Sequence, residues 1–155
     1  MYKFLPFLLT LFTIQFSFAQ SSGLTITDKG AAQLLSQNPQ KFLNDFNESD
    51  DLQFRFSGSG IKSGGVNLAV SLSIVTKDRT PKIIATSKRK VRKFKSGETL
   101  SPKQIFAKND LLFPNSTLAR LKPGSYKLVI QFSGGDGAAR KRFRTARKTI
   151  PFVWR

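Results

Sequence analysis

The feature that most constrains the fold is an alternation of apolar and polar residues that begins at Leu52 and recurs to the end of the chain. The alternation is clearest at positions 52–56, 66–74 and 126–132, with further extended runs at 82–94 and 138–154. A period of two directs alternate side chains to opposite faces of a strand, so one face can be buried. Short strands separated by turn residues predict a mainly β fold, an antiparallel β-sandwich.

Residues 20–51 follow a different pattern and predict a short helical preface to a sandwich domain at residues 52–155. Asp28 is placed to cap a helix ending at Gln37, and Asn38-Pro39 supplies a new N-cap followed by proline at the first helical position. The apolar residues expected to pack inward from this preface are Leu34, Leu35, Phe42, Leu43 and Phe46. Ser101-Pro102 predicts one short helix inserted among the strands, with the apolar residues after it, Ile105, Phe106, Leu111, Leu112 and Phe113, facing the core.

The first nineteen residues have the features of a secretory signal peptide. Lys3 precedes an apolar run at positions 4–18, and Ser17 and Ala19 are small residues suited to the −3 and −1 sites of cleavage. The run is shorter than the roughly 20 apolar residues of a membrane span, although a retained N-terminal anchor remains an alternative. We therefore expect a secreted or periplasmic protein of a Gram-negative bacterium, without a transmembrane segment after cleavage of residues 1–19.

The charge balance is strongly basic. The chain has 26 Lys and Arg residues against 9 Asp and Glu residues, a formal net charge of +17. Such an excess attracts anionic partners. The chain has no cysteine, so no disulfide stabilises the predicted domain and its stability depends on packing.

Two basic runs carry the candidate binding residues. If both are strands, each places three cations on one face, about 6.6–6.8 Å apart. The first predicted ladder is Lys88, Lys90 and Arg92, and the second is Arg140, Arg142 and Arg144. Phe143 and Ile150 have opposite parity in the second run, which predicts a β-bulge or a bend near Arg147-Lys148.

The ladders have two interpretations. In the first, they are a solvated sheet face and protect strand edges against aggregation. In the second, they bind a repeating anion of the cell envelope, such as lipopolysaccharide, an acidic glycan, a teichoic-type polymer, extracellular DNA or an anionic lipid surface. Sequence-specific nucleic-acid recognition is not expected, because aromatic residues do not alternate with the cations as a base-stacking surface requires. Direct pairing of the two ladders would be unfavourable, so we expect them to lie apart or to enclose an anion.

The residues needed for common catalytic sites are missing. The chain has neither histidine nor cysteine, which excludes Ser-His-Asp and Cys-His catalysis and histidine-ligated metals. Its few carboxylates do not suggest the paired acids of a glycosidase. The sequence therefore predicts a protein that is not an enzyme, with no catalytic residues, no metal and no cofactor.

The segment SGETLSPKQIFAKNDLLF, followed by LARLKPGSYKLVIQF, resembles the TANFOR domain of secreted bacterial surface proteins. The matching residues are Leu100, Ile105, Phe106, Leu121, Pro123, Gly124 and Tyr126. The resemblance implies a non-catalytic, immunoglobulin-like or macroglobulin-like extracellular domain.

These observations lead to two functional expectations. The first is an exported, non-catalytic binding module of the bacterial envelope that contacts an anionic polymer or membrane surface through a basic sheet face. The second is a protein–protein interaction subunit of an envelope or secretion complex, in which the sheet edges recruit a protein partner.

Overall fold

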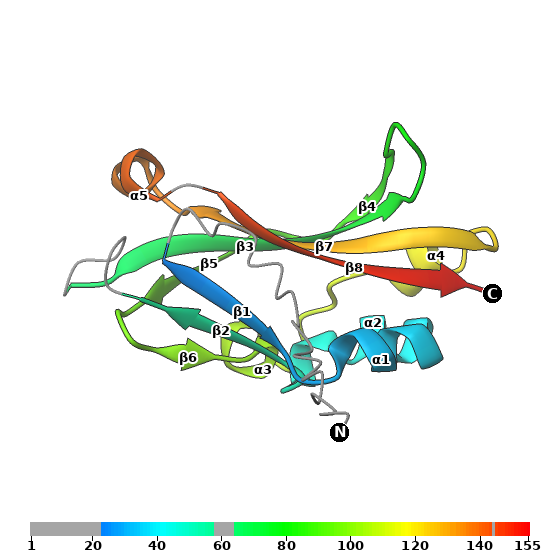
Figure 1. The fold of residues 1–155 in the computed structure, drawn as a ribbon, viewed down its shortest axis with the longest axis horizontal. Helices are drawn as coiled ribbons and strands as arrows, with labels where there is room; N and C mark the ends of the chain where they lie inside the picture. The colour runs from blue at the N-terminus through cyan, green and yellow to red at the C-terminus, as the bar shows by residue number, and fades with distance from the viewer. Residues whose placement is uncertain (1–22, 58–63, 144) are drawn as a thin grey trace, which may run out of the picture.

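The computed structural model has two antiparallel sheets and few helices, which confirms the predicted mainly β fold. It describes residues 23–57, 64–143 and 145–155, and only the backbone at residues 140–142. The predicted signal peptide, residues 1–19, lies outside the described residues. Figure 1 shows the smaller sheet and helices α1–α3 on one side of the larger sheet, with helix α5 on the other side.

The larger sheet has five strands and is built around strand β3. Its strands are β3 (Val66–Thr76), β4 (Ile83–Thr86), β5 (Lys90–Phe94), β7 (Gly124–Gly134) and β8 (Ala146–Trp154). One side of β3 pairs with β7 along most of its length, and β7 pairs in turn with β8. The other side of β3 pairs with β5 near its start and with β4 near its end. The run predicted at 82–94 is therefore two strands, not one.

The smaller sheet has three strands in the order β1 (Leu24–Asp28), β2 (Leu52–Phe56) and β6 (Thr99–Leu100). Strand β1 was not predicted, although its apolar residues alternate with polar ones and its β-branched run Thr25-Ile26-Thr27 favours a strand. It pairs along its whole length with β2. The segment interpreted as a helical preface thus begins with a strand that completes a sheet.

One of the two helix caps predicted in residues 20–51 is confirmed. Helix α1 (Ala31–Gln37) has Gly30 as its N-cap, without a side-chain cap, so the predicted cap at Asp28 is wrong by two residues; the Asp28 side chain instead accepts a hydrogen bond from the backbone N–H of Gly30 at 3.0 Å. Helix α2 (Pro39–Asn44) begins at Asn38, whose side chain accepts from the N–H of Lys41 at 3.1 Å, and the 3₁₀ helix η1 (Phe46–Glu48) follows.

In the described part of residues 52–155, the predicted sandwich domain, three short helices lie among the strands where one was expected. Helix α3 (Pro102–Ile105) is the predicted one, and Ser101 with Gln104 forms its capping box. Helices α4 (Asn115–Leu118) and α5 (Gly137–Arg142) were not predicted.

Phenylalanine rings from both sheets meet in the core. The ring of Phe132 in β7 lies 4.9 Å from that of Phe54 in β2, and Phe56 in β2 lies 4.4 Å from Phe94 in β5, centroid to centroid. All four side chains are fully buried. Most of the predicted inward residues of the helical segments are also buried, but Leu34 and Leu111 are exposed, the latter by 60%.

Candidate functional site

The first predicted ladder is divided by a break between strands β4 and β5. Ser87 is buried in this break, and its Oγ accepts a hydrogen bond from the backbone N–H of Leu72 at 2.9 Å. The side chain thus takes the place of a strand carbonyl, and residues 87–89 have no strand geometry. Lys88 is exposed in this break and does not continue the face of Lys90 and Arg92.

Lys90 and Arg92 lie on the inner side of the sheet, the side that also carries buried Phe94. Nζ of Lys90 forms an ion pair of 2.9 Å with Oδ2 of Asp110, and both side chains are about two-thirds buried. Nε of Arg92 donates to the carbonyl oxygen of Ile105 at 3.0 Å. These two cations therefore bind the end of α3 and the loop after it to β5. They do not form a row of cations that is free to bind a ligand.

Asp110 is the anionic partner at this contact. The hydrogen bond from Lys90 lowers the pKa of its carboxyl below the usual value, with help from the backbone N–H of Ala107 and from the charges of Lys90 and Arg92. Asp110 consequently remains ionised and holds its own loop to β5.

The second predicted ladder is not a strand. Residues Gly137–Arg142 form helix α5, and the side chain of its N-cap, Asp136, accepts from the N–H of Ala139 at 2.7 Å. Arg140 and Arg142 therefore belong to a helix, and Arg144 lies outside the described residues. Strand β8 is regular from Ala146, so the change of parity comes from the preceding helix and not from a bulge near Arg147-Lys148.

The fold nevertheless brings the two basic segments together. Nη2 of Arg89, just before β5, donates to the carbonyl oxygen of Gly134 at 2.8 Å, at the end of β7. The next residue, Gly135, donates its N–H to the carbonyl oxygen of Asn67 in β3 at 2.7 Å. The chain then enters α5, which lies over the outer face of the five-stranded sheet, the face turned away from the three-stranded sheet (Figure 1).

Further cations lie on the same outer face. Lys93 in β5 is opposite Asn67, and Arg147 in β8 is opposite Gln131 of β7; both cations are exposed. We call the exposed cations Lys88, Arg89, Lys93 and Arg147, together with helix α5, the basic end. Asp136 is an acid within this region, and its Oδ2 accepts from Nδ2 of Asn67 at 2.8 Å. The basic end thus combines exposed cations from residues 88–93 and from β8 next to the backbone of α5.

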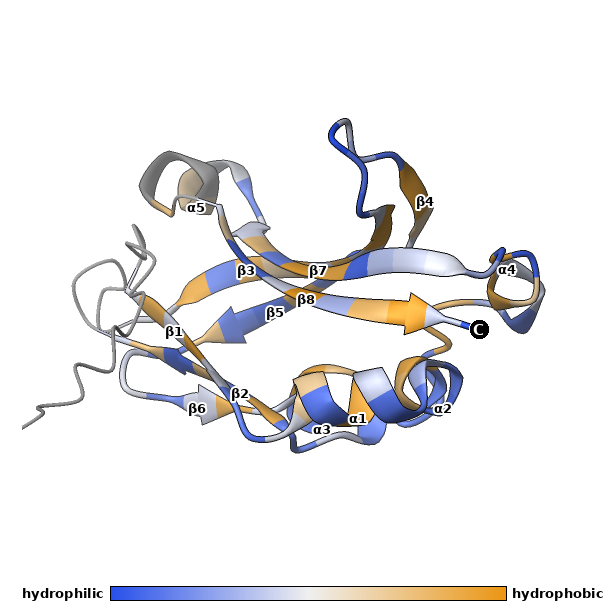
Figure 2. Ribbon diagram, turned by 45° about the vertical axis from the view of Figure 1, so that its right-hand side comes forward, coloured by the Kyte–Doolittle hydropathy of each residue, from blue (hydrophilic) through white to orange (hydrophobic). Residues whose placement is uncertain are grey.

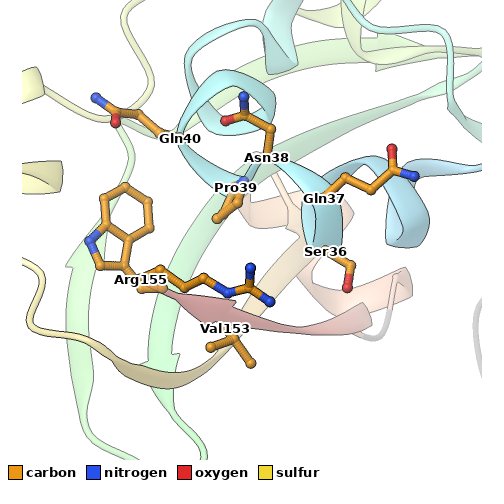
Figure 3. A pocket seen from close by; sticks show the side chains of 8 residues that line it. Ser36, Gln37, Asn38, Pro39, Gln40, Val153 and Arg155 are labelled. Carbon is orange, nitrogen blue, oxygen red and sulfur yellow. The ribbon is translucent and has the colours of Figure 1, made fainter.

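A small depression lies on another part of the surface, between the α1–α2 junction and the end of β8 (Figure 3). Its volume is about 180 Å³, below the roughly 300–1,000 Å³ of ordinary ligand pockets. The lining residues are Ser36, Gln37, Asn38, Pro39, Gln40, Val153, Trp154 and Arg155. Arg155 is the single lining residue with a charged side chain, so the depression offers polar contacts but no acid–base pair.

Searches for other kinds of site give no candidate in the described part of the chain. Among residues 23–57, 64–143 and 145–155, no group of three or more acidic, histidine or cysteine side chains is arranged to hold a metal ion. None of the helices in those ranges is long and apolar enough to cross a membrane. In comparisons with known proteins, no family model, no curated protein and no solved structure matches this chain.

Proposed function

We propose that this protein is an exported, non-catalytic binding module of the bacterial envelope that contacts an anionic polymer or membrane surface through its basic end. The observation that carries this proposal is the convergence of two basic segments, around positions 88–93 and 137–147, on one end of the outer sheet face. The absence of histidine and cysteine supports a role in binding rather than catalysis. The signal-peptide pattern of residues 1–19 supports export to the periplasm or cell exterior.

We further propose that the two sheets form a sandwich of the immunoglobulin-like kind. The phenylalanine contacts between β2 and strands β5 and β7 support face-to-face packing. Oη of Tyr126 also donates to the carbonyl oxygen of Lys122 at 2.8 Å. A tyrosine hydroxyl bonded to the backbone a few residues upstream is typical of such sandwiches.

The binding mechanism is electrostatic. Several cations on one rigid surface meet several charges of a polymer at once, and each contact releases counterions from the polymer, so affinity falls steeply as salt rises. Lys90 and Arg92 contribute less than the sequence suggested, because Asp110 and the Ile105 carbonyl already occupy them. Among the described residues, no ion pair or side-chain hydrogen bond occupies Lys93 or Arg147, so both remain available to the ligand.

The test compares two variants that remove the same charge from opposite ends of the sheet. Lys93→Ser with Arg147→Ser changes the basic end, while Lys77→Ser with Arg79→Ser changes the turn between β3 and β4. Binding is measured to heparin and, separately, to vesicles of anionic lipid at several salt concentrations. At about 1 kcal/mol per cation near an anionic surface, the first variant should lose roughly tenfold to thirtyfold in affinity, and the second much less.

The two ligands distinguish a polymer from a membrane surface. Equal losses in both variants would mean that net charge alone drives binding and would refute a localised site. Affinity that does not change with salt would refute the electrostatic mechanism.

A further inference from the structure

Strand β4 is an apolar edge strand that leaves the body of the sheet. It makes a short ladder with β3, from Ser73↔Thr86 to Val75↔Ile83, with an irregular register between Ile74 and Val75. Figure 2 shows the hairpin that carries β4 rising from the sheet, with hydrophobic colouring along the strand. Ile83 and Ile84 are 69% and 45% exposed, so two large β-branched side chains of this strand face solvent.

The outer edge of β4 also has free backbone groups. Antiparallel residues alternate between those bonded to the neighbour and those whose N–H and C=O point away. The N–H of Ser87 donates to Leu72 at 2.8 Å, so two residues earlier Ala85, opposite Ile74, also faces β3. Ile84 and Thr86 therefore direct their backbone groups to the other side, where none of the described strands pairs with β4.

The other long edge of the same sheet is protected against strand addition. Strand β8 contains Pro151, which has no N–H to offer, and Lys148 lies on its inner face between Ala146 and Ile150. Prolines and inward-pointing charges are common devices that stop one sheet from pairing with another. Strand β4 has neither of these two devices: its sequence, Ile83-Ile84-Ala85-Thr86, is uncharged and has no proline, and its protection is limited to its short length and its irregular register with β3.

We propose that β4 is a docking edge for an extended segment of a protein partner, which adds to the sheet as a further strand and carries acidic residues at its ends. The acidic ends follow from charge complementarity, because Lys82 precedes β4 and Lys88 and Arg89 follow it. Asp78, in the preceding turn, is the acid nearest in the sequence. Backbone hydrogen bonds supply affinity in strand addition, and Ile83 and Ile84 supply apolar contact.

A second copy of this chain fits the edge poorly. If two β4 strands paired antiparallel about their centres, Lys82 of one copy would lie opposite Ser87 of the other and beside its Lys88. Two chains of high net positive charge would also repel each other. The docking edge shares Lys88 and Arg89 with the basic end, but its backbone hydrogen bonds and the apolar contacts of Ile83 and Ile84 do not involve Lys93, Arg147 or α5.

The probe is a fluorescent peptide of alternating valine and threonine residues with aspartate and glutamate at both ends. The main variant is Ile84→Pro, which removes an outward donor at the free edge and changes no charge. One lost hydrogen bond and the added ring should weaken peptide binding by about tenfold or more in fluorescence anisotropy. A version of the peptide with lysines at both ends should bind weakly to the native protein.

Two further variants keep the proposal testable if Ile84→Pro unfolds the protein. Ile83→Ser should also weaken peptide binding, while Leu111→Ser, which removes a similarly exposed apolar side chain from a loop, should not. On binding, hydrogen exchange should slow at the amides of Ile84 and Thr86 but change little at Ala85, which is already bonded to β3.

Three results would overturn the proposal: no binding of the acidic peptide, equal binding by Ile84→Pro, or dimerisation of the native protein through β4 that Ile84→Pro abolishes. The variant Lys93→Ser with Arg147→Ser should bind the peptide normally. The docking edge and the basic end can therefore fail independently.

Discussion

Replacing Gly135 with alanine tests whether close packing of the β7–α5 junction on the five-stranded sheet is needed to hold α5 in the basic end. Gly135 connects β7 to α5 and donates its N–H to the carbonyl oxygen of Asn67 at 2.7 Å. A Cβ atom at this position would lie 2.9 Å from that oxygen, 3.0 Å from the Asn67 carbonyl carbon and 2.9 Å from Cγ1 of Val91. Two of these atoms belong to the backbone of the central strand and cannot move without disturbing the sheet.

The cost of Gly135→Ala can be worked from these contacts. Overpacking of this kind costs about 1–3 kcal/mol. If the chain moves away to relieve the contact, it also loses the hydrogen bond to Asn67, worth about 0.5–1.5 kcal/mol. We therefore expect the free energy of unfolding to fall by about 2–4 kcal/mol, or by less if α5 detaches locally while the sheets stay folded.

The assay is urea unfolding followed by the fluorescence of Trp154, with hydrogen exchange at α5 to detect local detachment. Gly137→Ala is the matched control, because a Cβ there meets no atom within 4 Å and alanine favours a helix more than glycine does. This control should leave stability unchanged or raise it by up to about 1 kcal/mol. The packing of α5 on the sheet would be refuted if Gly135→Ala and Gly137→Ala had the same stability, the same exchange at α5 and the same affinity for heparin.

Two other variants test the core and the inner ion pair. Phe132→Ala removes a fully buried ring that contacts Phe54 of the other sheet, and should lower the unfolding free energy by about 3–5 kcal/mol in the same urea assay; a loss below about 1 kcal/mol would mean that the sheets do not depend on this contact. Because the folded-state pKa of Asp110 lies below its usual value of 3.8, its pairing with Lys90 stabilises the fold above that pH and is lost as the carboxyl takes up a proton at lower pH. Asp110→Asn should therefore cost about 0.5–1 kcal/mol at pH 7 and progressively less as the pH falls below 3.8, and a cost that does not decrease with falling pH would contradict the ion-pair role.

Local signals in the sequence were sufficient for much of the fold. Strands β3 and β7 follow a clean alternation, with buried Leu72 and Ile130 facing the same side. Helices α2 and α3 begin where an N-cap residue precedes a proline, at Asn38 and Ser101. These features depend on neighbouring residues alone, so a single sequence is enough to predict them.

The candidate site was predicted less well, because its geometry depends on tertiary contacts. In β5 the inner face is fixed by Phe94, which packs on Phe56 of the other sheet, and this turns Lys90 and Arg92 inward and Lys93 outward. The four residues that precede Phe94 in β5 place a cation on each face, so the local sequence does not indicate which face is buried. The pairing with β3 decides it.

Helix α5 was not predicted, because its arginine and lysine residues were assigned the two-residue period of the strand that follows them. A signal was present: Asp136 is a good N-cap, and Ala138, Ala139 and the basic residues after them favour a helix. The role of Gly135 could not be predicted, since the atoms that exclude a side chain belong to β3 and β5, far away in the sequence.

The most direct test of the basic end is a map of amide chemical shifts as isotope-labelled protein is titrated with a heparin oligosaccharide at low salt. The account predicts that the largest changes occur at Arg89, Lys93, Arg147 and the backbone of α5, and that they disappear when salt is raised. Largest changes at residues 77–82, or changes spread evenly over all exposed cations, would contradict it.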